Sequence, residues 1–303
     1  MQKDHAPWAW SFCMGHNGPV KRIAVAALAF ACSLAIAQDQ PQRRVTKTGT
    51  IVFHEAVESK VLNNKRRVWI YLPPGYAESK ERYPVLYMHD GQNVFSGDTS
   101  YLPNLEWRAD EAAEALIKAK LIPPIVIVAI ANAEVERANE FLPTRARMGS
   151  QEAGGKADLY GKFITDELMP FVNKTYRTKT GPANTGLAGS SFGGIVTLHV
   201  GLTRPDVFGK LGVLSPSVWW DDRVMIKRVE ALPKKFGSRI WMDMGTLEGP
   251  GAVTDARRLR DALTAKGWKE GVDLVYYEDG FAVHNEGAWA SRIGMILLYL
   301  FGR

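Results

Sequence analysis

The stretch TGLAGSSFGG, at residues 185–194, decides the fold. Its centre matches the pattern G-x-S-x-G, in which a strand turns sharply into a helix and the serine adopts a strained backbone conformation at the turn. Small residues two positions before and after Ser191 let neighbouring backbones approach closely. The pattern predicts a serine hydroxyl lifted above a sheet, with the Phe192 N–H directed at the position of a developing oxyanion. A glycine-rich strand–helix turn with a structural serine is the alternative.

Strand-like and helix-like stretches alternate on both sides of this turn. The run IVIVAI at 125–130 is wholly apolar and β-branched, which is typical of a central parallel strand. Further strands are expected at 67–72, 84–88, 210–214, 239–244 and 272–277, and helices at 106–118, 157–175, 253–266 and 285–301. This alternation predicts an α/β fold with a mostly parallel sheet and helices on both faces. Because no linker interrupts the pattern, residues 48–303 are expected to form one domain.

A serine hydroxyl needs a base, and the histidines are the candidates. Four of them follow residue 37: His54, His89, His199 and His284. In chains with this serine motif the acid and then the base follow the serine. His284 fits that order, in a loop between the last expected strand and the last helix. His199 falls within the helix after the serine and His54 precedes the core strands, so both are expected to be structural.

The acid is expected in the loop after strand 239–244. Glu248 lies there, at the end of the strand where such sheets place their sites. Its role would be to orient the imidazole and stabilise the imidazolium. Asp255 is the second choice, a Ser–His pair with a weak third member is a third possibility, and Asp243 is expected to be structural because it falls within the strand.

The second oxyanion donor is expected in the turn HDGQN at 89–93, which follows the third strand. Gly91 lets the chain bend, and the Gln92 N–H is the natural donor. His89 and Asp90 are interpreted as residues that stabilise the turn.

Five segments together resemble a known family. They occur in the order HDGQN (89–93), GSSFGG (189–194), SPSVWW (215–220), GTLE (245–248) and HNEGAW (284–289). The set is similar to the putative-esterase group of α/β-hydrolases, which includes enterochelin (ferric siderophore), feruloyl and acetyl-xylan esterases, S-formylglutathione hydrolases and mycolyltransferases. The resemblance covers about residues 50–303. It implies an α/β-hydrolase fold with Ser191 as nucleophile, His284 as base, and Phe192 and Gln92 as oxyanion donors.

Three residues are candidates for substrate binding. Trp219 and Trp220 follow a strand beside the serine strand, so they could line the cleft mouth and stack on sugars or aromatic rings, or else cap the core. Arg137 lies in a segment that resembles the family's Arg-containing segment and could face the pocket or the solvent.

The resemblance implies a serine esterase that works through an acyl-enzyme, most like the enterochelin esterases. A carbohydrate esterase of the feruloyl or acetyl-xylan type and an acyltransferase are alternatives, and a non-catalytic binding relative is a weaker one. The expected partner is a small-molecule or glycan ester. No metal ion or organic cofactor is expected.

The N-terminal region resembles a secretory signal. Residues 23–37 are apolar, follow Lys21 and Arg22, and end in Ala-Ile-Ala. A run of this length is short of the ~20 residues that span a bilayer. A signal peptide over 1–37 and a flexible N-terminus over 38–47 are therefore expected, with a periplasmic or secreted product and no stable membrane insertion after cleavage.

Composition excludes several classes of protein. With 46% hydrophobic residues the chain can bury a large core. Cys13 and Cys32 both lie in the expected leader, so a mature chain would lack disulfides, a cysteine nucleophile and thiolate metal sites. The net charge is +6, and it falls to about +4 without the leader's three basic residues and one acidic residue. These charges are scattered, which argues against nucleic-acid binding. Nothing in the sequence indicates an oligomeric state.

Overall fold

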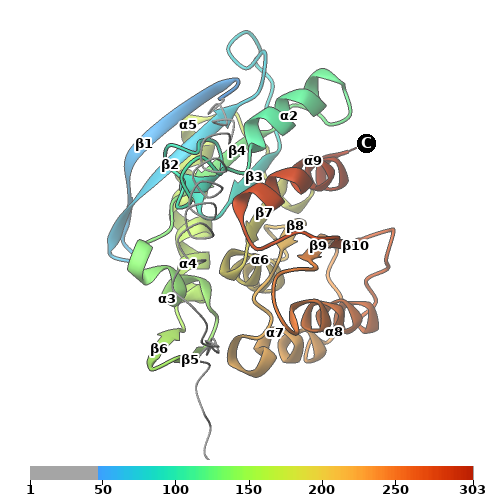
Figure 1. The fold of residues 1–303 in the computed structure, drawn as a ribbon. Coiled ribbons are helices and arrows are strands. Elements are labelled where there is room, and N and C mark those ends of the chain that lie inside the picture. Colours follow the sequence, from blue (N-terminus) through green and yellow to red (C-terminus); the bar gives the residue numbers. More distant parts are fainter. Residues whose placement is uncertain (1–46, 303) are drawn as a thin grey trace, which may run out of the picture. The chain divides into compact units, whose positions relative to one another are not determined.

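The computed structural model describes residues 47–302, which are built around an eight-stranded sheet (Figure 1). The strand order is β1-β2-β4-β3-β7-β8-β9-β10. The strands are β1 (Thr50–Ser59), β2 (Asn64–Leu72), β3 (Val85–Met88), β4 (Val126–Ile130), β7 (Thr185–Ser190), β8 (Lys210–Leu214), β9 (Arg239–Gly245) and β10 (Leu274–Asp279). The pairs β1–β2 and β2–β4 are antiparallel, and every other pair is parallel. The expected α/β-hydrolase architecture, a mostly parallel sheet, is confirmed.

Helices cover both faces of this sheet. They are α2 (Ala109–Lys118), α3 (Arg137–Phe141), α4 (Ala157–Lys162), α5 (Met169–Thr175), α6 (Phe192–Thr203), α7 (Trp220–Glu230), α8 (Ala252–Ala265) and α9 (Glu286–Phe301). Short helical segments are η1 (Gly91–Asn93), η2 (Glu134–Glu136), η3 (Phe163–Leu168) and η4 (Pro182–Asn184). Helices α2 and α9 pack together on one face, and the core of the other face draws on α4, α5, α6, α7 and α8.

The alternation of side chains along the strands produces these two cores. In β4, Val126 and Val128 belong to one apolar cluster, whereas Ile127 and Ala129 belong to the other. Successive side chains of a strand point to opposite faces, so a strand with helices on both sides must be apolar throughout. Parallel strands meet with their C-terminal ends at one edge, and that edge carries the loops of the candidate site.

Several elements depart from the expected ranges. Strand β1 was not expected, because it lies at the sheet edge and most of its residues are at least partly exposed. The short hairpin of β5 (Arg145–Met148) and β6 (Gln151–Gly154) and the helices α3 and α7 were not expected either. Strand β10 starts two residues later than expected, since the Asp273 carboxylate binds the Lys269 N–H and holds a turn there. Within residues 47–302, no helix has the length and apolarity to cross a membrane.

Candidate active site

Ser191 lies at a sharp turn between β7 and α6. Its backbone angles are φ 61° and ψ −124°, a region that non-glycine residues rarely adopt and that costs on the order of 1–3 kcal/mol. The surrounding backbone holds the conformation. The Ser191 N–H donates to the Leu214 carbonyl at 3.1 Å, and the Ser191 carbonyl accepts from Gly194 N–H at 3.1 Å.

The glycines of the motif are required by close packing at this turn. A Cβ on Gly189 would lie 2.8 Å from Cδ2 of His89 and 3.0 Å from the backbone of Gly193. A Cβ on Gly194 would lie 2.8 Å from the Leu214 carbonyl oxygen. The turn and the start of α6 therefore fit against β8 and the 89–93 turn only with small residues.

His284 and Glu248 form a hydrogen-bonded pair. His284 lies in the loop between β10 and α9, and its Nδ1 is 2.7 Å from Oε2 of Glu248. The His284 side chain is 40% exposed, whereas that of Glu248 is 1% exposed. The structure thus brings together the predicted base and the first-choice acid, with the carboxylate buried behind the imidazole.

The other oxygen of Glu248 is fixed by two further donors. Oε1 accepts from the Ser215 hydroxyl at 2.6 Å and from Gly245 N–H at 2.8 Å. Burial alone would raise the pKa of Glu248, but the hydrogen bonds from His284 and Ser215 outweigh it and hold that pKa below its usual value. The carboxyl is therefore kept as a carboxylate that can stabilise an imidazolium.

A buried arginine lies behind Ser215 and was not among the predicted site residues. Arg292 of α9 donates to the Ser215 hydroxyl at 3.1 Å, lies 3.2 Å from Asp243 and pairs with Asp279 at 2.8 Å. Trp289 also donates to the Ser215 hydroxyl, at 2.9 Å. Acidic residues near the ends of β9 and β10, together with a lone arginine in the apolar last helix, were the signal that could have revealed this cluster.

Asp255, the second-choice acid, lies elsewhere. It is in the first turn of α8 and accepts a hydrogen bond from Nε of Arg223 at 2.6 Å. Asp243 is fully buried and accepts hydrogen bonds from Ser215 N–H and the Trp241 indole, in keeping with its expected structural role. Of the three carboxylates considered, the one that contacts His284 is Glu248.

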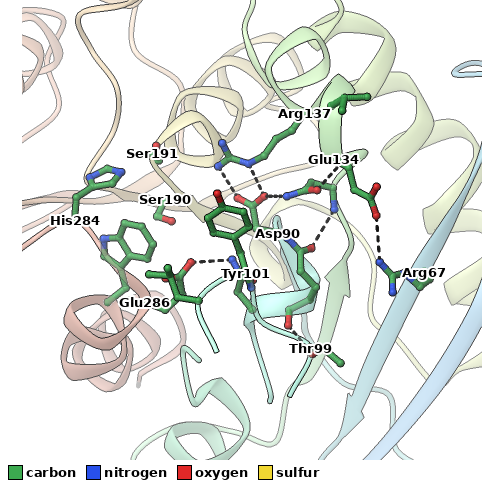
Figure 2. A pocket seen from close by; sticks show the side chains of 16 residues that line it. Arg67, Asp90, Thr99, Tyr101, Glu134, Arg137, Ser190, Ser191, His284 and Glu286 are labelled. Carbon is green, nitrogen blue, oxygen red and sulfur yellow. Dashed lines mark hydrogen bonds and ion pairs between the residues drawn. The ribbon is translucent and has the colours of Figure 1, made fainter. Parts of the chain in front are cut away.

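Ser191 and His284 line the same cavity, and Figure 2 shows both among its lining side chains. In the part of the chain that the structure describes, the hydrogen-bond partner of the Ser191 hydroxyl is Ser217, at an Oγ–Oγ distance of 3.4 Å, and not His284. Catalytic hydrogen bonds are often loose without substrate and tighten in the complex.

The two expected oxyanion donors belong to two different elements near the cavity. Phe192 is the first residue of α6, where backbone N–H groups have no acceptor within the helix. Gln92 lies in η1 and lines the cavity. The Thr99 hydroxyl donates to the Gln92 carbonyl at 2.6 Å, and the Gln92 side chain accepts from Asn132 N–H at 3.2 Å. These bonds fix the turn that carries the Gln92 N–H.

Asp90 and Arg137 connect this turn to α3. Arg137 donates through Nε and a terminal nitrogen to the two carboxylate oxygens of Asp90, at 2.6 and 2.8 Å, and Asn132 adds a bond at 2.6 Å (Figure 2). The Arg137 guanidinium lies 5.3 Å from the ring centre of Phe192, within cation–π range. Arg137 thus faces the cavity, and Asp90, in a left-handed conformation, stabilises the turn as interpreted from the sequence.

Two cavities meet at His284. The larger has a volume of about 800 Å³ and is lined on its serine side by Ser190, Ser191, Glu286 and Trp289, and on its other side by residues of the 90–102 and 132–137 segments. The smaller, about 270 Å³, lies between residues 215–219 and 248–255. His284 lines both.

The two tryptophans have different environments. Trp219 is 51% exposed and lines the smaller cavity. The expectation that Trp220 also contacts substrate is wrong: it is 1% exposed, and its indole N–H donates to the Thr144 hydroxyl at 3.2 Å. The two rings pack edge to face, with their centres 5.9 Å apart, so that the exposed Trp219 lies against the buried Trp220.

The remaining histidines are structural in their contacts. His199 lies between Asp158 and Arg228, and His54 bonds the Tyr176 hydroxyl. His89 is fully buried and hydrogen-bonded to Tyr160. Among residues 47–302 there is no cluster of three or more His, Cys, Asp or Glu side chains that could hold a metal ion.

Comparisons with known proteins agree with this geometry. The family model described as "Putative esterase" matches residues 59–300. The chain is 26% identical to "Uncharacterized protein YbbA" of Bacillus subtilis, over 78% of this chain and 93% of that protein. It is 31% identical to an "Endo-1,4-beta-xylanase/feruloyl esterase" of Xylanibacter ruminicola, over 66% of this chain but 25% of that protein. It is 27% identical to the "Iron(III) enterobactin esterase" of Dickeya dadantii, over 63% of this chain and 40% of that protein.

Solved structures show the same fold. An IroE-like serine hydrolase from Shewanella oneidensis superposes with a TM-score of 0.65 at 24% identity, over 82% of this chain and 79% of that one. The BES protein from Bacillus cereus superposes with a TM-score of 0.67 at 20% identity, over 88% of this chain and 100% of that one. With the family match over residues 59–300, the chain belongs to the putative-esterase family and is a serine esterase built on the α/β-hydrolase fold.

Proposed function

We propose that Ser191, His284 and Glu248 hydrolyse carboxylic esters through an acyl-enzyme. The observation that carries this proposal is the His284–Glu248 pair, at 2.7 Å, whose imidazole lines the same cavity as the strained Ser191. A serine hydroxyl is a weak nucleophile unless a base removes its proton, and a base works best when a third group fixes its tautomer.

The proposed reaction runs in two halves. With Nδ1–H donated to Glu248, Nε2 of His284 is free to take the Ser191 proton as Oγ attacks the ester carbonyl. The N–H groups of Phe192 and Gln92 hold the oxyanion. His284 then gives the proton to the departing alcohol and leaves an acyl-serine. Water, deprotonated by His284, attacks this ester, and the acid departs as Ser191 regains its proton.

The proposed substrate is a siderophore ester, as for the enterochelin esterases. Support comes from the relatives named iron(III) enterobactin esterase and from the exposed aromatic ring of Tyr101 at the larger cavity, which suits a flat ring such as a catechol. A feruloyl-type carbohydrate esterase is the second candidate. It is favoured by the relative with a feruloyl esterase name and by the exposed Trp219, which could stack on a sugar.

We also propose that the enzyme is periplasmic or secreted. The support is the signal-like segment 1–37, which lies outside the described residues, as does most of the segment 38–47. The proposed catalytic domain covers residues 48–303. The N-terminal sequence of the protein recovered from an expressing cell would test the proposed cleavage after Ala37.

The catalytic assignment is tested by Ser191→Ala with p-nitrophenyl acetate as substrate. We expect kcat to fall by at least ~10³-fold because the covalent intermediate cannot form. Ser291→Ala is the matched control, since that hydroxyl is exposed on α9 and donates to the Ala288 carbonyl of its own helix. Turnover by Ser191→Ala at the wild-type rate would refute the assignment.

The substrate is tested with a panel of enterobactin, both with and without iron, methyl ferulate, acetylated xylan and S-formylglutathione. The proposal expects the highest kcat/KM for the siderophore. A preference for methyl ferulate or acetylated xylan would instead support the carbohydrate esterase.

A further inference from the structure

Glu286 places a carboxylate in the larger cavity without a role in the proposed mechanism. It is the first residue of α9, two positions after the proposed base, and its side chain lines the cavity. The residue is 6% exposed, and its Oε1 accepts a hydrogen bond from the Asn93 side chain at 2.9 Å (Figure 2). The helix dipole favours an acidic residue in the first turn of a helix, but this effect does not require the carboxylate to line the substrate cavity.

The charges that surround Glu286 do not cancel its own. Of the cations lining this cavity, Arg137 is engaged by Asp90, and Arg67 faces Glu134 at 3.8 Å. Glu286 is the one lining carboxylate that forms no ion pair within residues 47–302, and the Asn93 side chain that donates to it is neutral. The cavity therefore carries a net negative charge, although the chain as a whole is basic.

We infer that Glu286 selects the electrical charge of the substrate, by disfavouring anionic groups in the larger cavity and accepting a hydrogen bond from a neutral hydroxyl-bearing group. This inference rests on the proposed esterase function and narrows its substrate class. An ionised carboxylate only accepts hydrogen bonds, so phenolic or sugar hydroxyls are suitable partners. A polyanionic ferric tris(catecholate) would be a poorer occupant of the cavity than its uncharged, iron-free ligand.

Because Glu286 is poorly solvated, its repulsion of an anionic substrate should be large enough to measure. Burial and the nearby Asp90 raise the pKa of Glu286, whereas Arg137 and His284 partly oppose that shift. A second anion held roughly 10 Å away, at an effective dielectric constant of about 20, would lose binding on the order of tenfold. The repulsion should weaken as salt is added.

The test compares esters that differ only in charge. The probes are p-nitrophenyl hydrogen adipate against the p-nitrophenyl ester of adipic acid monoamide, and 3-carboxyphenyl butyrate against 3-carbamoylphenyl butyrate, all at pH 8. These pairs place the negative charge in the acyl group or in the alcohol. For each pair we divide the kcat/KM of the anionic ester by that of the neutral ester. In Glu286→Gln we expect this ratio to rise about tenfold for the pair in which the group that carries the charge, acyl or alcohol, occupies the larger cavity. Glutamine keeps an oxygen that can accept from Asn93, so the turn should stay in place.

Glu58→Gln is the matched control, because it removes the same charge from an exposed site on β1. In the wild type the same ratio should rise with added salt, and in Glu286→Gln this dependence should shrink. Unchanged ratios for both pairs in Glu286→Gln, or an equal rise in Glu58→Gln, would overturn the inference. If the wild type and Ser191→Ala hydrolyse the neutral esters equally slowly, the proposed function fails instead. If the wild type is fully active on the neutral esters and Glu286→Gln leaves the anionic-to-neutral ratios unchanged, the charge selection alone is overturned and the proposed function stands.

Discussion

At the scale of single residues, the site depends on how firmly each side chain is held. Glu248 has a partner on each oxygen, His284 on one and Ser215 on the other, so its orientation is fixed before substrate arrives. His284 is held on its Nδ1 side and is otherwise open to the cavities. Such a preorganised acid allows the imidazole to accept a proton without the site rearranging.

Comparison of Glu248→Ala with Asp255→Ala tests which carboxylate serves the base. We expect Glu248→Ala to lower kcat on the order of 10²- to 10³-fold, because the imidazole loses its orienting partner. Asp255→Ala should cost far less, since that carboxylate binds Arg223 and not His284. Steady-state kinetics with p-nitrophenyl acetate measure both, and a larger loss in Asp255→Ala would contradict the assignment.

At the scale of elements, the turn after β3 is packed directly on the backbone of β4. A Cβ added to Gly91 would lie 2.5 Å from the Ile130 nitrogen and close to the Ala129 carbonyl. Backbone atoms in the middle of a sheet cannot move aside, so the turn itself would have to shift. Since this turn carries the Gln92 N–H, its position sets one half of the proposed oxyanion site.

Gly91→Ala is therefore expected to lower kcat more than it raises KM. Displacement of one oxyanion donor typically costs ~10²-fold in kcat. Gly237→Ala is the control, because its added Cβ would meet no atom within 4 Å. Kinetics and a thermal melt of both variants separate a shifted donor from general unfolding; an unchanged kcat in a folded Gly91→Ala would argue against the Gln92 N–H.

At the scale of the whole molecule, the core beneath the site contains a buried neutral histidine. Burial lowers the pKa of His89 to about 3, with Asp90 opposing and Arg137 assisting that shift. Because the histidine of the unfolded chain titrates near 6.5, the unfolded state binds a proton between these values and the folded state does not. The stability that His89 confers is thus full above pH 6.5 and is lost as the pH falls below it.

We expect the free energy of unfolding to fall between pH 7 and pH 5 with a contribution from His89 that approaches 1.4 kcal/mol per pH unit. His89→Gln should flatten that slope, whatever its effect on stability at pH 7. Urea unfolding at several pH values gives the slope directly. Equal slopes in the two proteins would show that His89 does not remain neutral in the folded state.

The fold could be predicted from the sequence where a local pattern determines the structure. Apolar runs identified β4 and β8, and the glycine-flanked serine identified the turn before α6. Edge strand β1 could not be identified in this way, because half-exposed strands lack a continuous apolar run.

The site residues could be predicted only where their order along the chain assigns them to the loops after the parallel strands. The loops after the parallel strands pointed to Glu248 and His284, but a choice between Glu248 and Asp255 needed a distance. The contact between Ser215 and Arg292 joins residues 77 positions apart along the chain. A lone arginine in an apolar helix signals a buried polar partner, but it does not identify that partner. The burial of Trp220 could not be predicted either, because the sequence of two adjacent tryptophans does not indicate which of them is buried.

The position of His284 leaves its imidazole in contact with two cavities. If the acyl group remains in the larger space, an incoming molecule can reach the imidazole through the smaller one. A water molecule takes up about 30 Å³ in the liquid, and the smaller space, at about 270 Å³, also has room for a small alcohol beside Trp219. Adding glycerol or ethanol to a turnover mixture should therefore transfer part of the acyl group to the added alcohol. The ratio of acid to new ester would measure how strongly the smaller cavity favours water over the alcohol.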